Sequence, residues 1–174
     1  MTLLNYLIKL LSMLVDFKLL SDSSKLWVFQ SDKIITPLNQ KFLTEKICPF
    51  LNDWSSHGAE IKSSFQIRYD LFLIFSVDEE INSASGCSID KLTNFIIQIS
   101  NEIGVDFFNR LNVAYKADSE KINLLSLSDF KTLISEGKIN EESIVFNNLI
   151  KTKKDYIERW EVQLKNSWHK TLLA

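Results

Sequence analysis

The sequence predicts an α+β fold, with a mostly antiparallel sheet and helices packed on one of its faces. Residues 61–69 alternate between apolar and polar side chains, the period-two pattern of a strand, and the apolar stretch 71–77 follows directly. The gap between these stretches is too short for a crossover helix, so we expect an antiparallel hairpin that turns near Tyr69 and Asp70. Apolar residues spaced by three and four over residues 88–103 predict a long helix.

A strand and a helix are expected before this hairpin. Residues 25–30 are rich in β-branched and aromatic side chains, which favours a short strand. Thr36 followed by Pro37 marks a helix start, because threonine caps free amides and proline suits the first helical position. Pro49 is expected to kink or split this helix, because its ring clashes with the preceding turn. The expected apolar face consists of Leu38, Phe42, Ile47, Phe50, Leu51 and Trp54.

The second half of the chain predicts further short elements. Gly104 stands at the end of the long helix, where glycine is favoured. The alternation of strands and helices is that of a ferredoxin-like (split βαβ) unit with C-terminal additions. The expected elements are strands over 112–116 and 121–125, a helix capped by Ser128 and closed by Gly137, a strand over 143–149, and a helix opened by Thr152.

The composition is that of an ordinary globular protein. With 174 residues, of which 45% are hydrophobic and 24% charged, the chain can form one core, so we expect a single domain over residues 13–174. Residues 1–12 are expected to be a dispensable extension, because they lack a defined polar face. The first twenty residues are largely apolar, but Lys9, Asp16 and Lys18 interrupt them before the roughly 20 apolar residues that a membrane span needs.

Charge and cysteine content narrow the partners and the compartment. The formal net charge is -2, so no overall positive field would draw the chain to nucleic acid. Two separated cysteines, Cys48 and Cys87, do not make a disulfide framework, which favours a cytoplasmic location. Together with the two histidines they lack metal-ligand spacing, so we expect neither a metal nor another cofactor.

The stretch SASGCSIDK, residues 83–91, is the main candidate site. Small residues, a glycine and a cysteine meet at the start of the long helix, where free amides favour an anion. The ligand-binding candidates are Ser85, Gly86, Ser88 and Lys91. The alternative is structural: a serine or the cysteine caps the helix, and Gly86 supplies a positive φ.

Cys87 is the candidate nucleophile or redox thiol, since a helix N-terminus favours the thiolate. Catalysis by cysteine normally needs a base, and His57 is the second catalytic candidate for that reason. A phosphate-binding loop of the Walker type is missing, because the chain reads GCSIDKLT around Gly86, with Asp90 where the second glycine would stand.

Two clusters lie further along the chain. Lys151, Lys153 and Lys154 predict the solvated start of a helix. Trp160 and Trp168 predict a tail that packs onto the domain, with a partner surface as the alternative.

Several segments resemble an uncharacterised bacterial protein family whose members are often labelled "ABC transporter ATPase". They occur in the same order over about residues 14–170 and read LWVFQSD, SFQIRYDLFLIFSVDE, SASGCSIDK, GKINEESIVFNNLI, and WEV followed by SWH. The resemblance implies no activity, cofactor or site residue. The sequence does not support the label, because it contains neither a Walker loop nor an LSGGQ-like signature.

The sequence favours a non-enzymatic binding or adaptor domain with an unknown protein partner, because it has many apolar and aromatic residues but no complete catalytic set. The alternative is a small enzyme, or an anion- or nucleotide-binding protein, that uses the loop at residues 83–91 with Cys87 as nucleophile or redox thiol. The residues leave open whether the chain is an enzyme.

Overall fold

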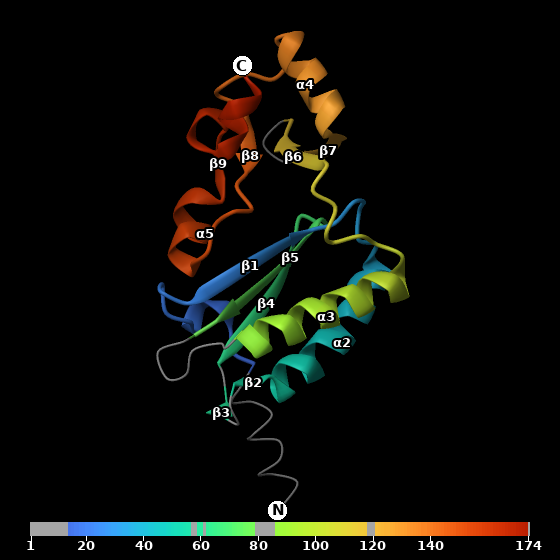
Figure 1. The fold of residues 1–174 in the computed structure, drawn as a ribbon, viewed down its shortest axis with the longest axis vertical. Helices are drawn as coiled ribbons and strands as arrows, with labels where there is room; N and C mark the ends of the chain where they lie inside the picture. Colours follow the sequence, from blue (N-terminus) through green and yellow to red (C-terminus); the bar gives the residue numbers. More distant parts are fainter. Residues whose placement is uncertain (1–13, 57–58, 61, 79–85, 118–120, 174) are drawn as a thin grey trace, which may run out of the picture.

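The computed structural model describes residues 14–56, 59–60, 62–78, 86–117 and 121–173, and it confirms an α+β fold built on antiparallel sheets (Figure 1). Three strands form the first sheet: β1 (Lys25–Gln30), β4 (Ser63–Arg68) and β5 (Phe72–Val77). Four form the second: β6 (Asn112–Lys116), β7 (Ile122–Ser126), β8 (Ile144–Phe146) and β9 (Glu161–Gln163). A short pair, β2 (Ser55–Ser56) and β3 (Ala59–Glu60), stands separately.

Strand β5 is the centre of the first sheet, as its unbroken apolar sequence predicts. It pairs antiparallel with β1 on one side and with β4 on the other, so Phe75 lies between Trp27 and Phe65. Every residue of β5 is buried. The predicted hairpin turn is also confirmed: Tyr69 and Asp70 have φ angles of 53° and 52°, and the Leu71 amide donates to the Arg68 carbonyl.

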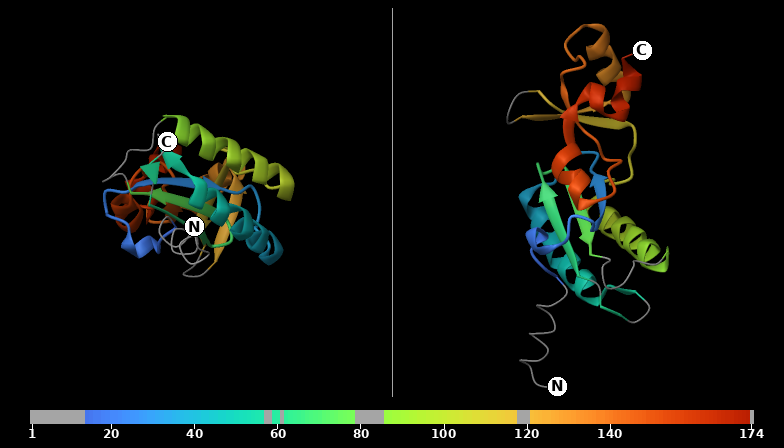
Figure 2. Two further views of the ribbon diagram at one scale, coloured as in Figure 1. Left: turned by 90° about the horizontal axis from the view of Figure 1, so that it is seen from below. Right: turned by 90° about the vertical axis from the view of Figure 1, so that its left-hand side faces the viewer.

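Two helices, α2 (Pro37–Asp53) and α3 (Gly86–Ile103), cover one face of the first sheet (Figures 1 and 2). The core beneath them contains Leu73, Phe75 and Val77 from β5, which alternate along the strand. The prediction of helices on one face is therefore confirmed. The other face of the sheet is also covered, which explains why β5 shows no period-two pattern.

The helix ends follow from single side chains. Thr36 caps α2 by accepting from the Asn39 amide at 3.3 Å, as predicted. Gly104 and Gly137 follow α3 and α4 (Leu127–Ser135) with φ angles of 63° and 71°, which glycine adopts at little cost. The predicted cap at Ser128 is wrong, because the cap lies two residues earlier: Ser126 accepts from the Asp129 amide at 3.0 Å, and the helix begins at Leu127.

Two parts of the expectations for α2 are corrected. Pro49 was expected to kink or split the helix, and the split is wrong, because the helix continues through Pro49 to Asp53. The expected apolar face is also shifted, because Leu38 is 77% exposed. The buried side chains are Leu43, Ile47 and Leu51, which are spaced by four and therefore lie along one stripe of the helix.

The chain departs from a complete ferredoxin-like unit after α3. The first sheet has the strand order β1-β5-β4, which matches three strands of a split βαβ unit. A fourth strand would pair with the free edge of β1. There the Leu26 amide donates to the Lys151 carbonyl at 2.9 Å, and Lys25 forms a single antiparallel bridge with Thr152. Strand β6 consequently pairs elsewhere and starts the second sheet, in the order β7-β6-β8-β9.

A shared apolar cluster joins the two sheets into one domain. Phe72 and Ile74 of β5 pack in it with Phe146 of β8 and with Trp160, which follows helix α5 (Lys153–Arg159). Three short 3-10 helices complete the described chain, and sequence periodicity does not reveal them: η1 (Phe17–Leu19), η2 (Leu164–Asn166) and η3 (Trp168–Leu172). Residues 1–12, expected to be dispensable, lie outside the described residues. In the described part of the chain, no helix has the length and apolar character needed to cross a membrane.

Candidate functional site

A cleft of about 550 Å³ lies between the first sheet and the second. Strand β1 contributes one part of its lining, the connection from α3 to β6 a second, and the C-terminal helix η3 a third. Its volume is typical of small-molecule sites, which span roughly 300 to 1,000 Å³. The lining residues are Val28, Phe29, Gln30, Phe107, Phe108, Asn109, Arg110, Asn112, Val113, Phe146, Asn148, Leu149, Trp168 and His169.

A chain of hydrogen bonds fixes the polar groups that join the two sheets at this cleft. The Gln30 side chain donates to the Asn112 carbonyl at 3.0 Å and accepts from the Asn148 side chain at 3.0 Å. The indole N–H of Trp160 donates to Asn148 Oδ1, also at 3.0 Å. Each of these donors therefore has an acceptor within the protein, and the three bonds link β1, β6 and the segment after β8.

Aromatic rings supply much of the apolar lining. Phe108 is 38% exposed and meets Phe29 edge to face, with the ring centres 5.7 Å apart. Trp168 is 39% exposed and stacks on the His169 ring at 3.9 Å. Exposed ring surface in a concave site offers a flat ligand a stacking partner.

Polar groups without a partner lie among these rings. Within the described residues, neither the guanidinium of Arg110 nor the side-chain amide of Asn112 forms a hydrogen bond or ion pair. The Asn109 side chain accepts from the Leu111 amide at 2.8 Å through its oxygen, which leaves its NH₂ group available. The lining residues include no carboxylate, so Arg110 supplies the charge of the cleft.

His169 lies at the same cleft and is 3% exposed. Its Nδ1 atom is hydrogen-bonded to the Ser167 hydroxyl at 2.8 Å, and its Nε2 atom has no partner among the described residues. Burial lowers the pKa of His169 from 6.5 to about 4, because desolvation disfavours the imidazolium. The ring is therefore neutral at physiological pH.

Lowering the pH from about 7 to about 5 is expected to reduce the free energy of unfolding by about 2 kcal/mol through His169. In the unfolded chain the His169 ring binds a proton near pH 6.5, whereas in the folded chain it is protonated only near pH 4. The stabilisation is thus complete above pH 6.5 and is lost as the pH falls toward 4. Urea unfolding across this range measures it.

The chain has two histidines, so the test compares two variants that both carry H57Q. His169 is then the remaining histidine in the first variant and is replaced as well in the second. The variant H57Q should show the full pH dependence between about pH 7 and pH 5, and the double variant H57Q/H169Q should lose most of it. Equal slopes for the two proteins would mean that His169 is not held neutral by burial.

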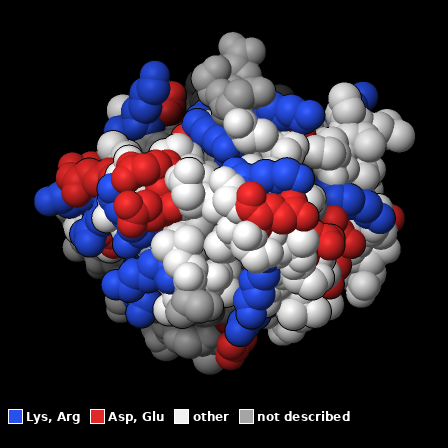
Figure 3. Space-filling view, turned by 90° about the horizontal axis from the view of Figure 1, so that it is seen from above, with Lys and Arg blue, Asp and Glu red and all other residues white. Residues whose placement is uncertain are grey.

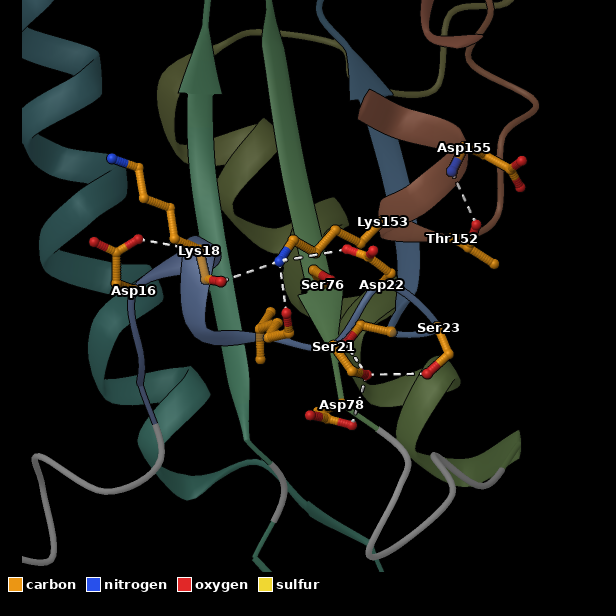
Figure 4. A network of polar contacts seen from close by, with 12 residues as sticks. Asp16, Lys18, Ser21, Asp22, Ser23, Ser76, Asp78, Thr152, Lys153 and Asp155 are labelled. Atoms are coloured by element: carbon orange, nitrogen blue, oxygen red, sulfur yellow. Dashed lines mark hydrogen bonds and ion pairs between the residues drawn. The ribbon is translucent and has the colours of Figure 1, made fainter. Parts of the chain in front are cut away.

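Lys153 forms a second polar centre, on the side of the domain where η1 meets α5 (Figure 4). Its side chain is 7% exposed, and its ammonium donates to the carbonyls of Lys18 at 3.2 Å and Leu20 at 2.5 Å. Asp22 lies 4.0 Å away, and the Phe17 ring centre 5.5 Å away. The predicted solvated lysine cluster is therefore wrong at Lys153, although Lys151 and Lys154 are exposed.

None of the residues of the site predicted from the sequence is among the residues that line the cleft. Gly86, Cys87 and Ser88 form the first turn of α3, and their side chains lie outside the described set. Ser85 and His57 lie outside the described residues altogether. Lys91 is exposed and does not line the cleft.

Two details bear on the predicted roles of glycine and cysteine. Gly86 is the first residue of the helix itself, not of the loop before it, so the argument for a positive φ there loses its basis. Cys48 is half-buried in α2, and burial raises the pKa of its thiol, which makes it a less reactive cysteine.

Sequence reasoning missed most of the cleft residues. Gln30 ends a predicted strand, and Asn112 begins one, so each resembles an ordinary strand boundary. Their proximity depends on how the two sheets pack, which no local pattern reports. Trp160 and Trp168 were the available signal: Trp160 is a core residue as expected for a packed tail, whereas Trp168 presents an exposed face at the cleft.

The surface at the α4 end of the molecule carries interspersed charges of both signs (Figure 3). Exposed ion pairs also occur in the C-terminal half of the chain, including Glu142 with Lys165 and Glu136 with Lys138. Paired charges largely cancel at a distance, so this face offers no strong field of one sign.

No protein-family model matches the chain, and neither a curated protein nor a solved structure does. The resemblance described for the sequence consequently stays a prediction. Among the described residues, no group of three or more His, Cys, Asp or Glu side chains is placed to hold a metal ion.

Proposed function

We propose that this chain is a non-enzymatic binding domain whose ligand site is the cleft between the two sheets. The observation that carries the proposal is a concave site of about 550 Å³ that combines exposed aromatic rings with unpartnered polar side chains. Such a combination is the usual character of a small-molecule site.

The chemistry of the lining favours binding over catalysis. The lining residues include no Cys, Ser, Thr, Lys, Asp or Glu, so they offer none of the common nucleophiles. The neutral His169 is a poor general base near pH 7, because its pKa of about 4 lies far below the operating range. What the cleft does offer is hydrogen bonding, one positive charge and flat apolar surface.

The cleft is also held open by the fold. Gln30 and Asn148 engage each other and the neighbouring groups across the two sheets, so binding would need little rearrangement there. A site formed in advance loses less conformational entropy on binding. The proposal includes the cytoplasmic location expected from the cysteine content of the sequence.

A set of neutral, anionic and cationic one- and two-ring aromatic fragments should include compounds that bind at this cleft. The expected result is a saturable change in the amide NMR signals of Arg110, Asn112 and His169 in the ¹⁵N-labelled protein. The variant F108A should bind such fragments several-fold more weakly, because it removes an exposed ring from the lining.

Ile157→Ala is the matched control, since Ile157 is an exposed apolar residue of α5 that does not line the cleft. This variant should bind the fragments as the unchanged protein does. The proposal fails if no fragment of any charge shifts the cleft signals, or if F108A and I157A have the same effect.

A further inference from the structure

The cleft has an uncompensated positive charge. Arg110 lines it, and within the described chain its guanidinium has neither an ion-pair partner nor a hydrogen bond. The lining contributes no carboxylate, and the buried ring of His169 is neutral. An anionic group on the ligand would therefore meet an attractive field, whereas a cationic group would meet an unfavourable one.

A guanidinium suits an oxyanion in geometry as well as in charge. Its planar arrangement of N–H donors can engage two oxygens of a carboxylate, sulfonate or phosphate together. The unengaged NH₂ group of Asn109, next to Arg110 in the chain and also in the lining, adds a neutral donor. Because both groups are available, an anion can bind without breaking an existing contact.

The remainder of the lining suits a flat apolar body. Phe108 and Trp168 both line the cleft and each expose more than a third of their surface. Stacking against such rings favours a planar aromatic group over a branched aliphatic one.

His169 adds a neutral hydrogen-bonding group to the lining. Its Nδ1 atom is hydrogen-bonded to the Ser167 hydroxyl, whereas its Nε2 atom has no partner within the described residues. Among those residues, the fully buried side-chain polar atoms without a partner are Asn52 Oδ1 and Ser100 Oγ, so Nε2 is not sealed from the cleft and a ligand there can bond to it.

We propose that the cleft binds a planar aromatic acid, with its ring system against Phe108 and Trp168 and its anionic group at Arg110. This inference rests on the proposed function, because it names the ligand class of the same site. The shared chemistry is an oxyanion carried by an aromatic ring system.

Three naphthalene probes of one shape test the charge requirement: 2-naphthoate, the neutral 2-naphthamide and the cationic 2-naphthylmethylamine. Binding is measured by NMR titration of the unchanged full chain. We expect 2-naphthoate to bind about tenfold more tightly than 2-naphthamide, and the amine to bind more weakly than either. Sodium acetate tests whether an anion alone is enough, and it should not saturate the site.

The variants separate the role of charge from the role of the ring. R110Q should weaken binding of 2-naphthoate to the level of 2-naphthamide and leave the amide unaffected. R159Q is the matched control, because Arg159 is an exposed arginine of α5 outside the lining, and it should change neither affinity. W168A should weaken both probes to a similar degree, since both contain the same ring system.

The outcomes distinguish this inference from the proposed function. If aromatic probes bind at the cleft but naphthoate and naphthamide bind equally, or R110Q leaves their ratio unchanged, the ligand class is wrong and the binding domain stands. If acetate alone saturates the site, the ring is not required and the ligand is a simple anion. If no probe of any charge binds, both proposals fail.

Discussion

Trp160→Ala is expected to lower the free energy of unfolding by about 4 kcal/mol, the upper range for loss of a large buried aromatic side chain. Trp160 is 2% exposed and packs against Phe72 at 5.0 Å and Phe146 at 4.9 Å between ring centres. It therefore contacts both sheets at once. Its indole N–H also holds the Asn148 side chain, which would lose a hydrogen-bond donor. Urea unfolding at neutral pH measures the change.

Two companion variants show why Trp160 matters. W160F keeps a ring in the cluster but lacks the indole donor, so it should cost less than W160A and still disturb the NMR signals of Asn148 and Gln30 at the cleft. W168A should cost about 1 kcal/mol or less, because Trp168 is substantially exposed. A cost below about 1 kcal/mol for W160A would contradict a core shared by the two sheets.

The sequence predicts the individual elements of the first sheet, but it does not predict the core that the two sheets share. The central position of β5 follows from its unbroken apolar sequence, and the hairpin with β4 follows from the short gap between the strands. Helix α3 follows from apolar spacing, and Gly104 from its place at the helix end. Each of these inferences uses residues close together in the sequence.

The second sheet could not be derived in the same way. Its order β7-β6-β8-β9 places β6 beside β8, and these strands are separated by α4 in the chain. The periodicity of a strand does not indicate its pairing partner, so it cannot predict whether β6 pairs with β1 or begins a new sheet. The edge of β1 near Leu26 is engaged by Lys151, more than a hundred residues away, and that long-range contact cannot be inferred from local patterns.

The candidate site shows the same limit more strongly. The stretch around Cys87 was a candidate because its features are contiguous, whereas the cleft gathers Gln30, Arg110, Asn148 and His169 from separate segments. Amide side chains at strand ends and a single arginine in a loop are common on protein surfaces. Only the packing of the sheets makes them one site, so local motifs could not identify it.

Lys153→Ala is expected to lower the free energy of unfolding by about 3 kcal/mol. The ammonium of Lys153 donates to the carbonyls of Lys18 and Leu20 (Figure 4). It also lies over the Phe17 ring, 5.5 Å from the ring centre. Alanine would leave the Leu20 carbonyl without a donor at a buried contact and the Lys18 carbonyl without one at a half-buried contact. A buried unpartnered group costs about 1 to 3 kcal/mol. The loss should loosen the segment around η1, which urea unfolding and amide hydrogen exchange at Leu20 both report.

Lys154→Ala is the matched control, because the neighbouring lysine has the same side chain but is 62% exposed and pairs with Glu158 along the helix. Its cost should be within about 0.5 kcal/mol of zero, as for most surface ion pairs. K153M retains most of the apolar stem and removes the donor, so a large loss with methionine as well would assign the effect to the carbonyls and not to packing. Equal stability of K153A and K154A would show that the two lysines are interchangeable, and the buried ammonium would then not anchor η1 to α5.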